Sequence, residues 1–300
     1  MKDLKKVKVV VLCGGLSSER KVSLVTGRAM YEELKKNGHS VTLADVDSRS
    51  LSKIEGLKAD VVLNGLHGTY GEDGVMQGIL DFLGVPYAGS GVTGSSVAMD
   101  KILSKEIMKA NGILTPVWQV IGRADELKIK YPVVLKPAAE GSAVGVFIVK
   151  NKKEAAAAFT KAKKYGDVLA EAYIKGREIS VPVLGGRALP AIEIVPKNEF
   201  YDYDAKYTPG QSEHIIPARI GAKLLRQAGA VALKVHGVLR CRDFSRTDMI
   251  VKGGRLYVLE TNTLPGMTGT SLFPESAKAA GISFYALLCE MIKSALRGKK

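Results

Sequence analysis

The chain has 300 residues, a formal net charge of +14, and 46% hydrophobic and 25% charged residues. These values are ordinary for a water-soluble globular protein of two or three domains, and no apolar run approaches the roughly 20 residues that a membrane-spanning helix needs. The first apolar run is short and lacks a small-residue cleavage site, so we interpret it as a strand rather than a signal peptide. Cys13, Cys241 and Cys289 have neither disulfide nor metal spacing, which indicates a reducing, cytoplasmic environment.

The positive charge is compatible with nucleic acid, a membrane surface or an anionic ligand as partner. The lysines are spread along predicted helix faces, as at Lys35-Lys36 and Lys152-Lys153, and no compact block of arginine and aromatic residues is present. A solvated basic surface is therefore the favoured interpretation, and we expect neither a nucleic-acid nor a membrane partner.

The first part of the chain alternates strands and helices. Val7–Leu12, Val41–Val46 and Asp60–Leu63 read as strands, and a helix ends near residue 37, which predicts a doubly wound parallel sheet. Ligands bind at the carboxyl ends of such strands, where Glu19 and His67 fall. The alternatives are that Glu19 only caps the helix and that His67 is structural.

A short helix at 73–83 and a long amphipathic helix at 94–110 lead to a domain boundary near residues 115–116. The second part then reads as strands at 117–121, 133–136, 146–149 and 168–174, with a helix at 152–164. This order predicts a compact α+β unit.

Lys136 ends one of these strands and opens the Gly/Ser-rich loop 136–145, which is suited to cradle phosphate and to close as a lid. The loop is neither a Walker A motif nor a Rossmann fingerprint, and an ordinary hairpin turn is the alternative. The strand end at Glu171 to Ile174 offers backbone groups to an adenine, and Glu178 is suited to bind ribose hydroxyls, although neither feature is distinctive alone.

The third part begins near residues 184–187 and contains a strand at 188–195. An aromatic and polar loop at 200–207 has no core pattern and reads as a segment covering a site. Helices are expected at 219–236 and, closing the chain, at 276–296.

The strongest local pattern is a hairpin whose strands, 247–251 and 255–260, are joined through Gly253-Gly254. The hairpin brings Asp248 and Glu260 to the same end, with Asn262 two residues further on the same face. Simple alternation places Leu256 and Val258 on the face of Glu260. Two carboxylates and an amide oxygen are hard ligands that suit Mg²⁺, and solvated charges at the hairpin ends are the alternative.

These features occur together with several short motifs, and the sequence closely resembles the D-alanine–D-alanine ligases of the ATP-grasp superfamily over nearly its whole length. The motifs that carry the resemblance are Gly14-Gly15 with Ser18-Glu19-Arg20, Leu66-His67-Gly68 with Gly71-Glu72-Asp73-Gly74, Gly89-Ser90-Gly91, Met99-Asp100-Lys101, Glu140-Gly141-Ser142, Tyr201-Asp202-Tyr203 with Ala205-Lys206-Tyr207, and Asn262-Thr263 with Pro265-Gly266-Met267-Thr268.

The resemblance implies an α/β fold in which an N-terminal doubly wound parallel sheet joins two α+β ATP-grasp subdomains that clasp ATP. The implied divisions are residues 1–95 for the substrate-binding domain, 96–184 for the central domain with the Gly-rich lid, and 185–300 for the C-terminal domain with the metal hairpin. The implied reaction joins two D-alanines through an acyl phosphate for peptidoglycan precursor synthesis. A cytoplasmic homodimer, paired through the first domain, is also implied.

The resemblance also implies roles for single residues on the nucleotide side. ATP would be bound by Lys101, Lys136, Glu171, Tyr173, Ile174 and Glu178. Two Mg²⁺ or Mn²⁺ ions would be held by Asp248, Glu260 and Asn262.

On the amino-acid side, Glu19 would hold the ammonium group of the first D-alanine and His67 would lie near its carboxylate. Ser142 and Tyr207 would hydrogen-bond with Glu19. Lys206 would reach the transferred phosphoryl group. Arg246 and the backbone N–H of Gly266 would form an oxyanion hole, and Ser271 and Leu272 would form the second-alanine subsite.

A tyrosine at position 207 goes with an amine as second substrate in this family. Ligases for D-lactate or D-serine, a catalytically inactive ATP-grasp regulator and a nucleic-acid-binding protein are the alternatives. The chain departs from the family pattern at Ala143, which replaces a second serine of the loop, and at Arg240 and Arg242, which we expect near the substrate pocket.

Overall fold

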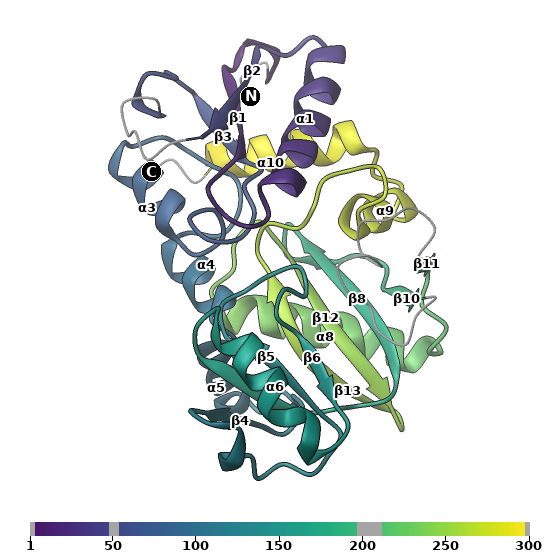
Figure 1. Cartoon of the computed structure of the whole chain (residues 1–300). Coiled ribbons are helices and arrows are strands. Elements are labelled where there is room, and N and C mark those ends of the chain that lie inside the picture. The colour runs from purple at the N-terminus through teal and green to yellow at the C-terminus, as the bar shows by residue number, and fades with distance from the viewer. Residues whose placement is uncertain (1–3, 48–53, 197–211, 298–300) are drawn as a thin grey trace.

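The computed structural model describes residues 4–47, 54–196 and 212–297 (Figure 1). Within these ranges the strands form three sheets, with strand orders β2-β1-β3, β4-β7-β5-β6 and β11-β10-β8-β12-β13, where β9 pairs with β8. The predicted combination of a doubly wound parallel sheet with two α+β parts is confirmed, and the sheets of the two α+β parts are antiparallel.

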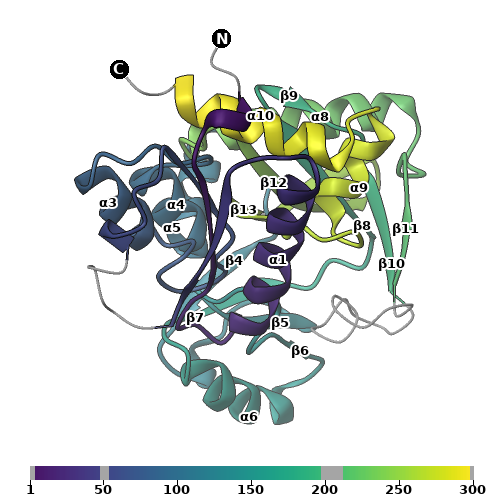
Figure 2. The same cartoon turned by 90° about the horizontal axis from the view of Figure 1, so that it is seen from above.

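The first sheet is parallel and is covered by helices on both faces (Figures 1 and 2). Alternation along each strand sends Val9 and Val11 to one face and Val10 and Leu12 to the other, so both faces bury apolar side chains. Its elements are β1 (Val9–Gly14), α1 (Arg20–Lys36), β2 (Val41–Val46), β3 (Val61–Asn64) and α3 (Val75–Phe82).

The end of the chain returns to this first sheet. The predicted closing helix at 276–296 is instead two helices, α9 (Leu272–Ala279) and α10 (Phe284–Arg297), which meet at an angle of 103°. The side chains of Leu287 and Ile292 on α10 are fully buried with α1 and the first sheet, and Figure 2 shows α10 alongside them. No single helix of the described residues is long and apolar enough to span a bilayer, and only the bent α9–α10 pair meets that requirement by length and composition.

The predicted long helix at 94–110 is also two helices, α4 (Val92–Met99) and α5 (Lys101–Ala110). The chain is extended at Asp100, with φ −80° and ψ 103°, and the Asp100 carboxylate accepts hydrogen bonds from the N–H groups of Ile102 and Leu103. Asp100 thus caps α5, because its side chain satisfies N–H groups that have no partner within the helix. As a result Lys101 is the first residue of α5.

The central sheet is antiparallel and carries one covering helix. Its elements follow the predicted order closely: β4 (Trp118–Ile121), β5 (Val133–Pro137), β6 (Phe147–Val149), α6 (Lys152–Lys163) and β7 (Val168–Ala172). The loop between β5 and β6 is the Gly/Ser-rich segment of the sequence.

The largest sheet packs one face against a helix whose small side chains Ala228 and Ala232 are fully buried. Its elements are β8 (Arg177–Leu184), β9 (Arg187–Ala188), β10 (Ile192–Pro196), β11 (Ser212–Ile215), α8 (Ala222–Val238), β12 (Phe244–Lys252) and β13 (Arg255–Asn262). Strand β8 pairs with both β10 and β12, so it belongs to this sheet although it precedes residue 185.

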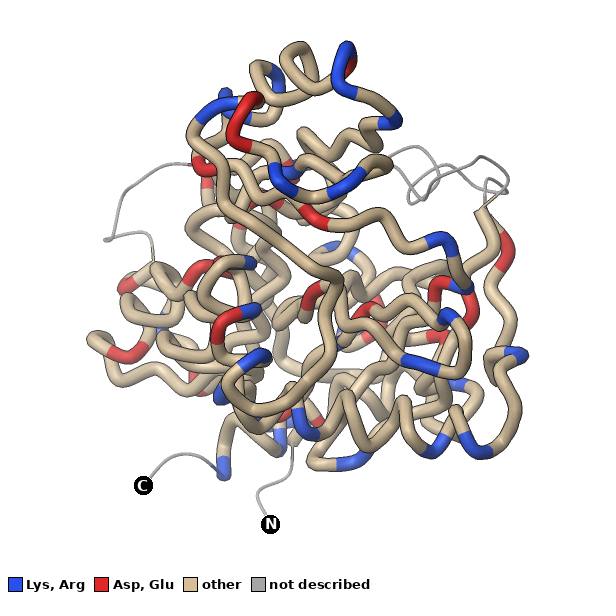
Figure 3. Tube along the Cα trace, turned by 90° about the horizontal axis from the view of Figure 1, so that it is seen from below, with Lys and Arg blue, Asp and Glu red and all other residues tan. Residues whose placement is uncertain are grey.

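Lysines and arginines are distributed over all parts of the described chain and are interleaved with acidic residues (Figure 3).

Candidate active site

The predicted hairpin is formed by β12 and β13. Asp248 pairs directly with Glu260, and Arg246 pairs with Asn262. Paired residues of an antiparallel ladder share a face, and residues two apart along a strand share it too. All four side chains therefore lie on one face of the sheet, as the sequence predicts for the three oxygen ligands.

The prediction that Val258 shares the face of Glu260 is wrong. The register shifts between the pairs Asp248–Glu260 and Met249–Val258, so Leu259 is the extra residue of a β-bulge. Val258 packs with Met249 against α8, whereas Leu259 and Glu260 both line a pocket on the opposite face. The bulge thus turns two consecutive side chains toward the pocket.

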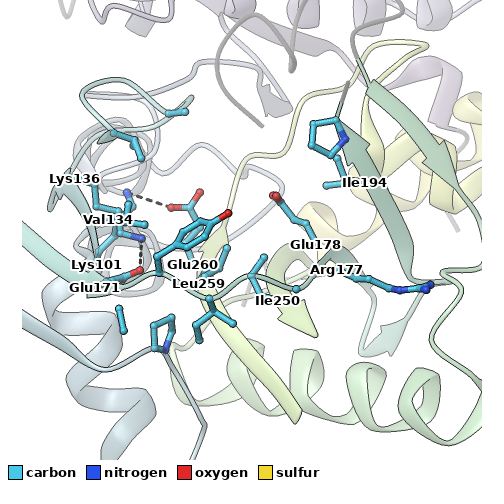
Figure 4. A pocket seen from close by; sticks show the side chains of 18 of the residues that line it. Lys101, Val134, Lys136, Glu171, Arg177, Glu178, Ile194, Ile250, Leu259 and Glu260 are labelled. Carbon is cyan, nitrogen blue, oxygen red and sulfur yellow. Dashed lines mark ion pairs between the residues drawn. The ribbon is translucent and has the colours of Figure 1, made fainter. Parts of the chain in front are cut away.

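This first pocket lies between the central and the largest sheet (Figure 4). The six residues predicted to bind ATP all line it: Lys101, Lys136, Glu171, Tyr173, Ile174 and Glu178. Apolar side chains from both sheets complete its walls, among them Val134, Ile250 and Leu259. A cavity with apolar walls and a few charged groups is suited to a flat base carrying a charged tail.

Two lysines lie on one wall of this pocket. The Nζ atom of Lys101 donates to the carbonyl oxygen of Glu140 at 2.6 Å and lies 3.4 Å from Oε2 of Glu260. The Nζ atom of Lys136 lies 3.0 Å from Oε2 of Glu171 (Figure 4). Both ammonium groups are therefore fixed by carboxylates or a carbonyl of the pocket itself.

A second pocket lies between the first sheet and the hairpin and shares Glu260 with the first. It is lined by Glu19, His67, Ser142, Arg246, Asn262, Gly266, Ser271 and Leu272, all of which were predicted from the sequence. The topology thus brings together residues from four separate segments of the chain.

Glu19 occupies the N-cap position just before α1, but its carboxylate makes no capping hydrogen bond there, so the capping alternative is wrong. The carboxylate is buried and accepts a hydrogen bond from the hydroxyl of Ser142 in the Gly-rich loop, as the resemblance implies. A Cβ atom added to Gly141 would lie 2.6 Å from Glu19 Oε2, so glycine lets the loop backbone approach this carboxylate. The loop therefore contacts the first domain.

His67 is buried, and its Nε2 atom lies 3.0 Å from the Thr26 hydroxyl. Burial, and after it the nearby Arg246, lowers the pKa of His67 to about 4, so the ring is neutral near pH 7. A neutral imidazole is suited to a hydrogen bond with a substrate rather than to charge pairing.

Glu72 also lines this pocket and was absent from the predicted site residues. Its Oε2 atom accepts a hydrogen bond from the N–H of Gly68 at 2.7 Å. Burial, and after it the charge of Glu19, raises the pKa of Glu72 to about 8. The Gly-rich segment 68–74 was the available sequence signal, but the proximity of Glu72 to Glu19 appears only in the fold.

The carboxylate of Asp248 is held on both oxygens by the Arg246 guanidinium, at 3.0 and 2.8 Å, and accepts a further hydrogen bond from the Ser180 hydroxyl at 2.6 Å. Asn262 Oδ1 accepts from the N–H of Leu264 at 2.8 Å and retains a second lone pair. The predicted ligands fit a cation chemically, because two carboxylates and an amide oxygen are hard oxygen donors. Arg246 and Lys101 neutralise the two carboxylates in this structure. Within the described residues no group of three or more His, Cys, Asp or Glu is arranged so that it could hold a metal ion, and the predicted set contains only two of these residue types.

The start of α9 and the residues just before it line another part of the second pocket. Ser271 precedes α9, and its hydroxyl accepts a hydrogen bond from the N–H of Thr268 at 3.1 Å. A Cβ atom at Gly266 would lie 2.9 Å from the Ser271 Oγ, so glycine leaves room for this hydroxyl in its observed position.

Several predicted features lie elsewhere or outside the described residues. Lys206 and Tyr207 fall in the range 197–211, which the structure does not describe. Arg240 and Arg242, which were predicted to lie near the substrate pocket, are not among the residues that line either pocket. Arg242 instead lies over the ring of Tyr87 and donates to the carbonyl oxygen of Gly89, in the segment that leaves the first domain.

A nucleotide-sized pocket that shares a carboxylate with a second, polar pocket defines the architecture of an ATP-dependent ligase of the ATP-grasp class. Comparison with known proteins narrows this class. The protein-family model described as D-ala D-ala ligase C-terminus matches residues 107–293 of the sequence. The family model described as D-ala D-ala ligase N-terminus matches residues 45–90.

Curated relatives and solved structures agree. The D-alanine–D-alanine ligase of Geotalea uraniireducens is 46% identical, covering 98% of this chain and 97% of the relative, and that of Carboxydothermus hydrogenoformans is 44% identical, covering 98% and 100%. A crystal structure of the Bacillus anthracis D-alanine–D-alanine ligase is similar to this chain with a TM-score of 0.86 and 39% sequence identity. A second crystal structure of that ligase, complexed with ATP, gives a TM-score of 0.85 and 36% identity. Each comparison covers 98% of both chains. The chain belongs to the D-alanine–D-alanine ligase family.

Proposed function

We propose that this protein joins two D-alanines to D-alanyl-D-alanine at the expense of ATP, for peptidoglycan precursor synthesis. A carboxylate oxygen of the first D-alanine attacks the γ-phosphorus of ATP and releases ADP, which leaves an acyl phosphate. The amine of the second D-alanine then attacks the acyl carbon, and the carbon–oxygen bond to phosphate breaks. The products are the dipeptide, ADP and phosphate, and the amine loses a proton.

The observation that carries this proposal is the junction of the two pockets at Glu260. A nucleotide in the first pocket, with its base near Glu171 and its phosphates near Lys101 and Lys136, directs its terminal phosphate toward that junction. A carboxylate in the second pocket is then in line to receive it. Such a reaction needs mainly charge neutralisation and alignment.

On the nucleotide side, Lys101 and Lys136 supply point charges for the phosphates. Tyr173 and Ile174 supply backbone groups for the base, and Glu178, which comes from β8 across the pocket (Figure 4), accepts from ribose hydroxyls. Asp248, Glu260 and Asn262 would hold two Mg²⁺ or Mn²⁺ ions, which when bound neutralise charge on the transferred phosphate.

On the amino-acid side, the buried Glu19 carboxylate receives the ammonium of the first D-alanine, and the neutral His67 lies close to that alanine's carboxylate. Arg246 and the N–H of Gly266 stabilise the oxyanion that forms when the second amine attacks. Ser271 and Leu272 form the second-alanine subsite. Lys206 would reach the transferred phosphate. Tyr207 would hydrogen-bond with Glu19, and a tyrosine at this position favours an amine as second substrate.

The proposal extends to the organisation of the molecule. We propose three domains: an N-terminal substrate-binding domain, a central domain with the Gly-rich lid, and a C-terminal domain with the metal hairpin. The boundary between the last two moves from residue 184 to the connection between β7 and β8, because β8 pairs within the largest sheet. A cytoplasmic homodimer, paired through the first domain, completes the proposal.

Phosphate release from ATP tests the proposed function. With D-alanine alone and Mg²⁺ we expect turnover, and removal of Mg²⁺ by a chelator is expected to stop it. Adding D-lactate or D-serine to D-alanine tests the rival ligases, which predict turnover only with the mixture. No turnover with D-alanine alone, or salt-sensitive nucleic-acid binding without ATP turnover, would contradict the proposal.

A further inference from the structure

Lys105 is a buried charge that the proposed reaction does not use. Its side chain is completely inaccessible to solvent, and its Nζ atom lies 2.7 Å from Oε1 of Glu171. Lysine is almost never fully buried unless it is paired, and a buried ion pair is on average no more stabilising than apolar side chains of similar size. A fully buried charge beside a carboxylate that lines the nucleotide pocket therefore points to a role in that pocket.

The geometry of α5 links Lys105 to the pocket. Lys101 and Lys105 are four residues apart and lie on the same face of the helix. Lys101 lies beside Glu260 at the junction of the two pockets, whereas Lys105 lies beneath Glu171. One helix thus places one cation beside Glu260 and another beside Glu171, and both carboxylates line the nucleotide pocket.

Glu171 is held on both of its oxygens. Lys105 contacts Oε1 and Lys136 contacts Oε2, and the backbone of Glu171 pairs on β7 with Trp118 on one side and Val134 on the other. The carboxylate is 2% exposed and lies in the wall of the pocket. It therefore has little freedom to change its position when a ligand binds.

The charge state of Glu171 depends on these lysines. Burial raises the pKa of this carboxyl group, but the charges of Lys105 and Lys136 outweigh burial and hold the pKa below its usual value. Burial likewise lowers the pKa of Lys105, and Glu171 opposes that shift. An ionised carboxylate only accepts hydrogen bonds, whereas a protonated one also donates.

We propose that Lys105 is a positioning residue that keeps Glu171 an acceptor-only group, so that the pocket selects a purine with an amino group at position 6 over one with a carbonyl there. This inference rests on the proposed ATP site. The amino group of adenine donates a hydrogen bond to the carboxylate. The carbonyl of hypoxanthine faces the carboxylate with a second acceptor, so the two groups repel each other and the buried carbonyl is left without a donor.

The test compares the binding of ATP and inosine triphosphate by equilibrium dialysis in the absence of D-alanine. The variants are Lys105→Met, Glu171→Gln and the double variant, and Lys109→Met is the matched control, because Lys109 is exposed one turn further along α5. We expect the preference for ATP to fall about ten- to hundredfold in Lys105→Met and in Glu171→Gln. In the double variant it should stay within about twofold of Glu171→Gln, because Lys105 acts through Glu171.

An unchanged preference in folded Lys105→Met overturns the proposal, as does a further fall in the double variant. Circular dichroism shows whether Lys105→Met is folded. If it is not, Glu171→Gln decides: an unchanged preference in that variant overturns the proposal and a lost preference supports it. Because dialysis needs no turnover, a wild-type protein that prefers ATP but does not consume D-alanine contradicts the proposed function and leaves this inference intact.

Discussion

At the scale of single residues, the two carboxylates proposed to bind metal lie beside cations. Asp248 is paired with Arg246, and Glu260 lies near Lys101. Both positive groups also line the pockets into which substrates would enter. The charges of this region are thus arranged around the site where the terminal phosphate is proposed to lie.

Replacing either carboxylate by its amide is expected to abolish ligation with little change in fold. Asp248→Asn and Glu260→Gln each remove one negative charge from the proposed metal site while keeping the shape of the side chain. We expect phosphate release to fall at least about a hundredfold, because metal charge stabilisation amounts to several kcal/mol. The control is Glu290→Gln, because the Glu290 side chain lies on the solvent-facing side of α10. Near-normal turnover in either site variant would show that the metal assignment is wrong.

Glu72 predicts a pH dependence of stability. Its pKa of about 8 in the folded protein exceeds the usual value of 4.5, so between these values the folded state binds more protons than the unfolded state. Stability is therefore lost as the pH rises from about 4.5 to about 8, by at most about 5 kcal/mol at about 1.4 kcal/mol per pKa unit.

Glu72→Gln removes this titration. Urea unfolding at pH 5, 6, 7 and 8 should show the variant gaining free energy of unfolding relative to wild type as the pH rises. The exposed Glu32→Gln is the control, and its difference from wild type should not vary in this way. A Glu72→Gln difference that is constant with pH would contradict the shifted pKa.

Some residues of the site could be predicted from a short stretch of sequence, whereas others are recognised only in the fold. Asp248, Glu260 and Asn262 could be predicted because one hairpin brings them together, and Lys136 because it ends a strand before a Gly-rich loop. Glu72 and Lys105 could not, because the carboxylates beside them, Glu19 and Glu171, lie on segments distant in the sequence. Most of the remaining residues were predicted from the family resemblance rather than from local chemistry.

At the scale of secondary-structure elements, the β-bulge in β13 decides which side chains face the nucleotide pocket. Regular alternation turns Leu259 away from the face of Glu260, whereas the bulge lets both line the pocket. A bulge leaves no simple pattern in the sequence, because one extra residue interrupts the period of two. Similarly, the break at Asp100 divides an otherwise continuous helical pattern.

Leu259→Ala and Leu256→Ala test the bulge from the same strand. Leu259→Ala should raise the KM for ATP about five- to tenfold and leave that for D-alanine unchanged, because it removes apolar contact with the nucleotide. Leu256→Ala should lower stability without raising the KM for ATP, because Leu256 packs against the α8 side of the sheet. The reverse pattern in steady-state kinetics would contradict the observed register.

At the scale of the whole molecule, the chain closes on itself through α10. This C-terminal helix packs on the N-terminal sheet, so the first and last parts of the chain share one core (Figure 2). The parallel first sheet could be predicted from the alternation of strands and helices. The packing of α10 and the pairing of β8 with β12 could not, because contacts such as that of Ser180 with Asp248 join residues 68 positions apart.

Ile292→Ala should therefore loosen the first domain and not the central one. Removing a fully buried isoleucine is expected to cost about 2–5 kcal/mol of unfolding free energy. Hydrogen exchange should become faster at the amides of β1 and β3 and stay unchanged in β5 and β7. The exposed neighbour Lys293→Ala serves as the control. Equal acceleration in both sheets would contradict this division of the core.

The most direct test of the account is a crystal structure with a non-hydrolysable ATP analogue and Mg²⁺. We predict that the base lies near Glu171 and that the terminal phosphate, with its metal ions, lies where the two pockets meet, beside Asp248, Glu260 and Lys101. A terminal phosphate and ions bound away from this junction would contradict the central claim.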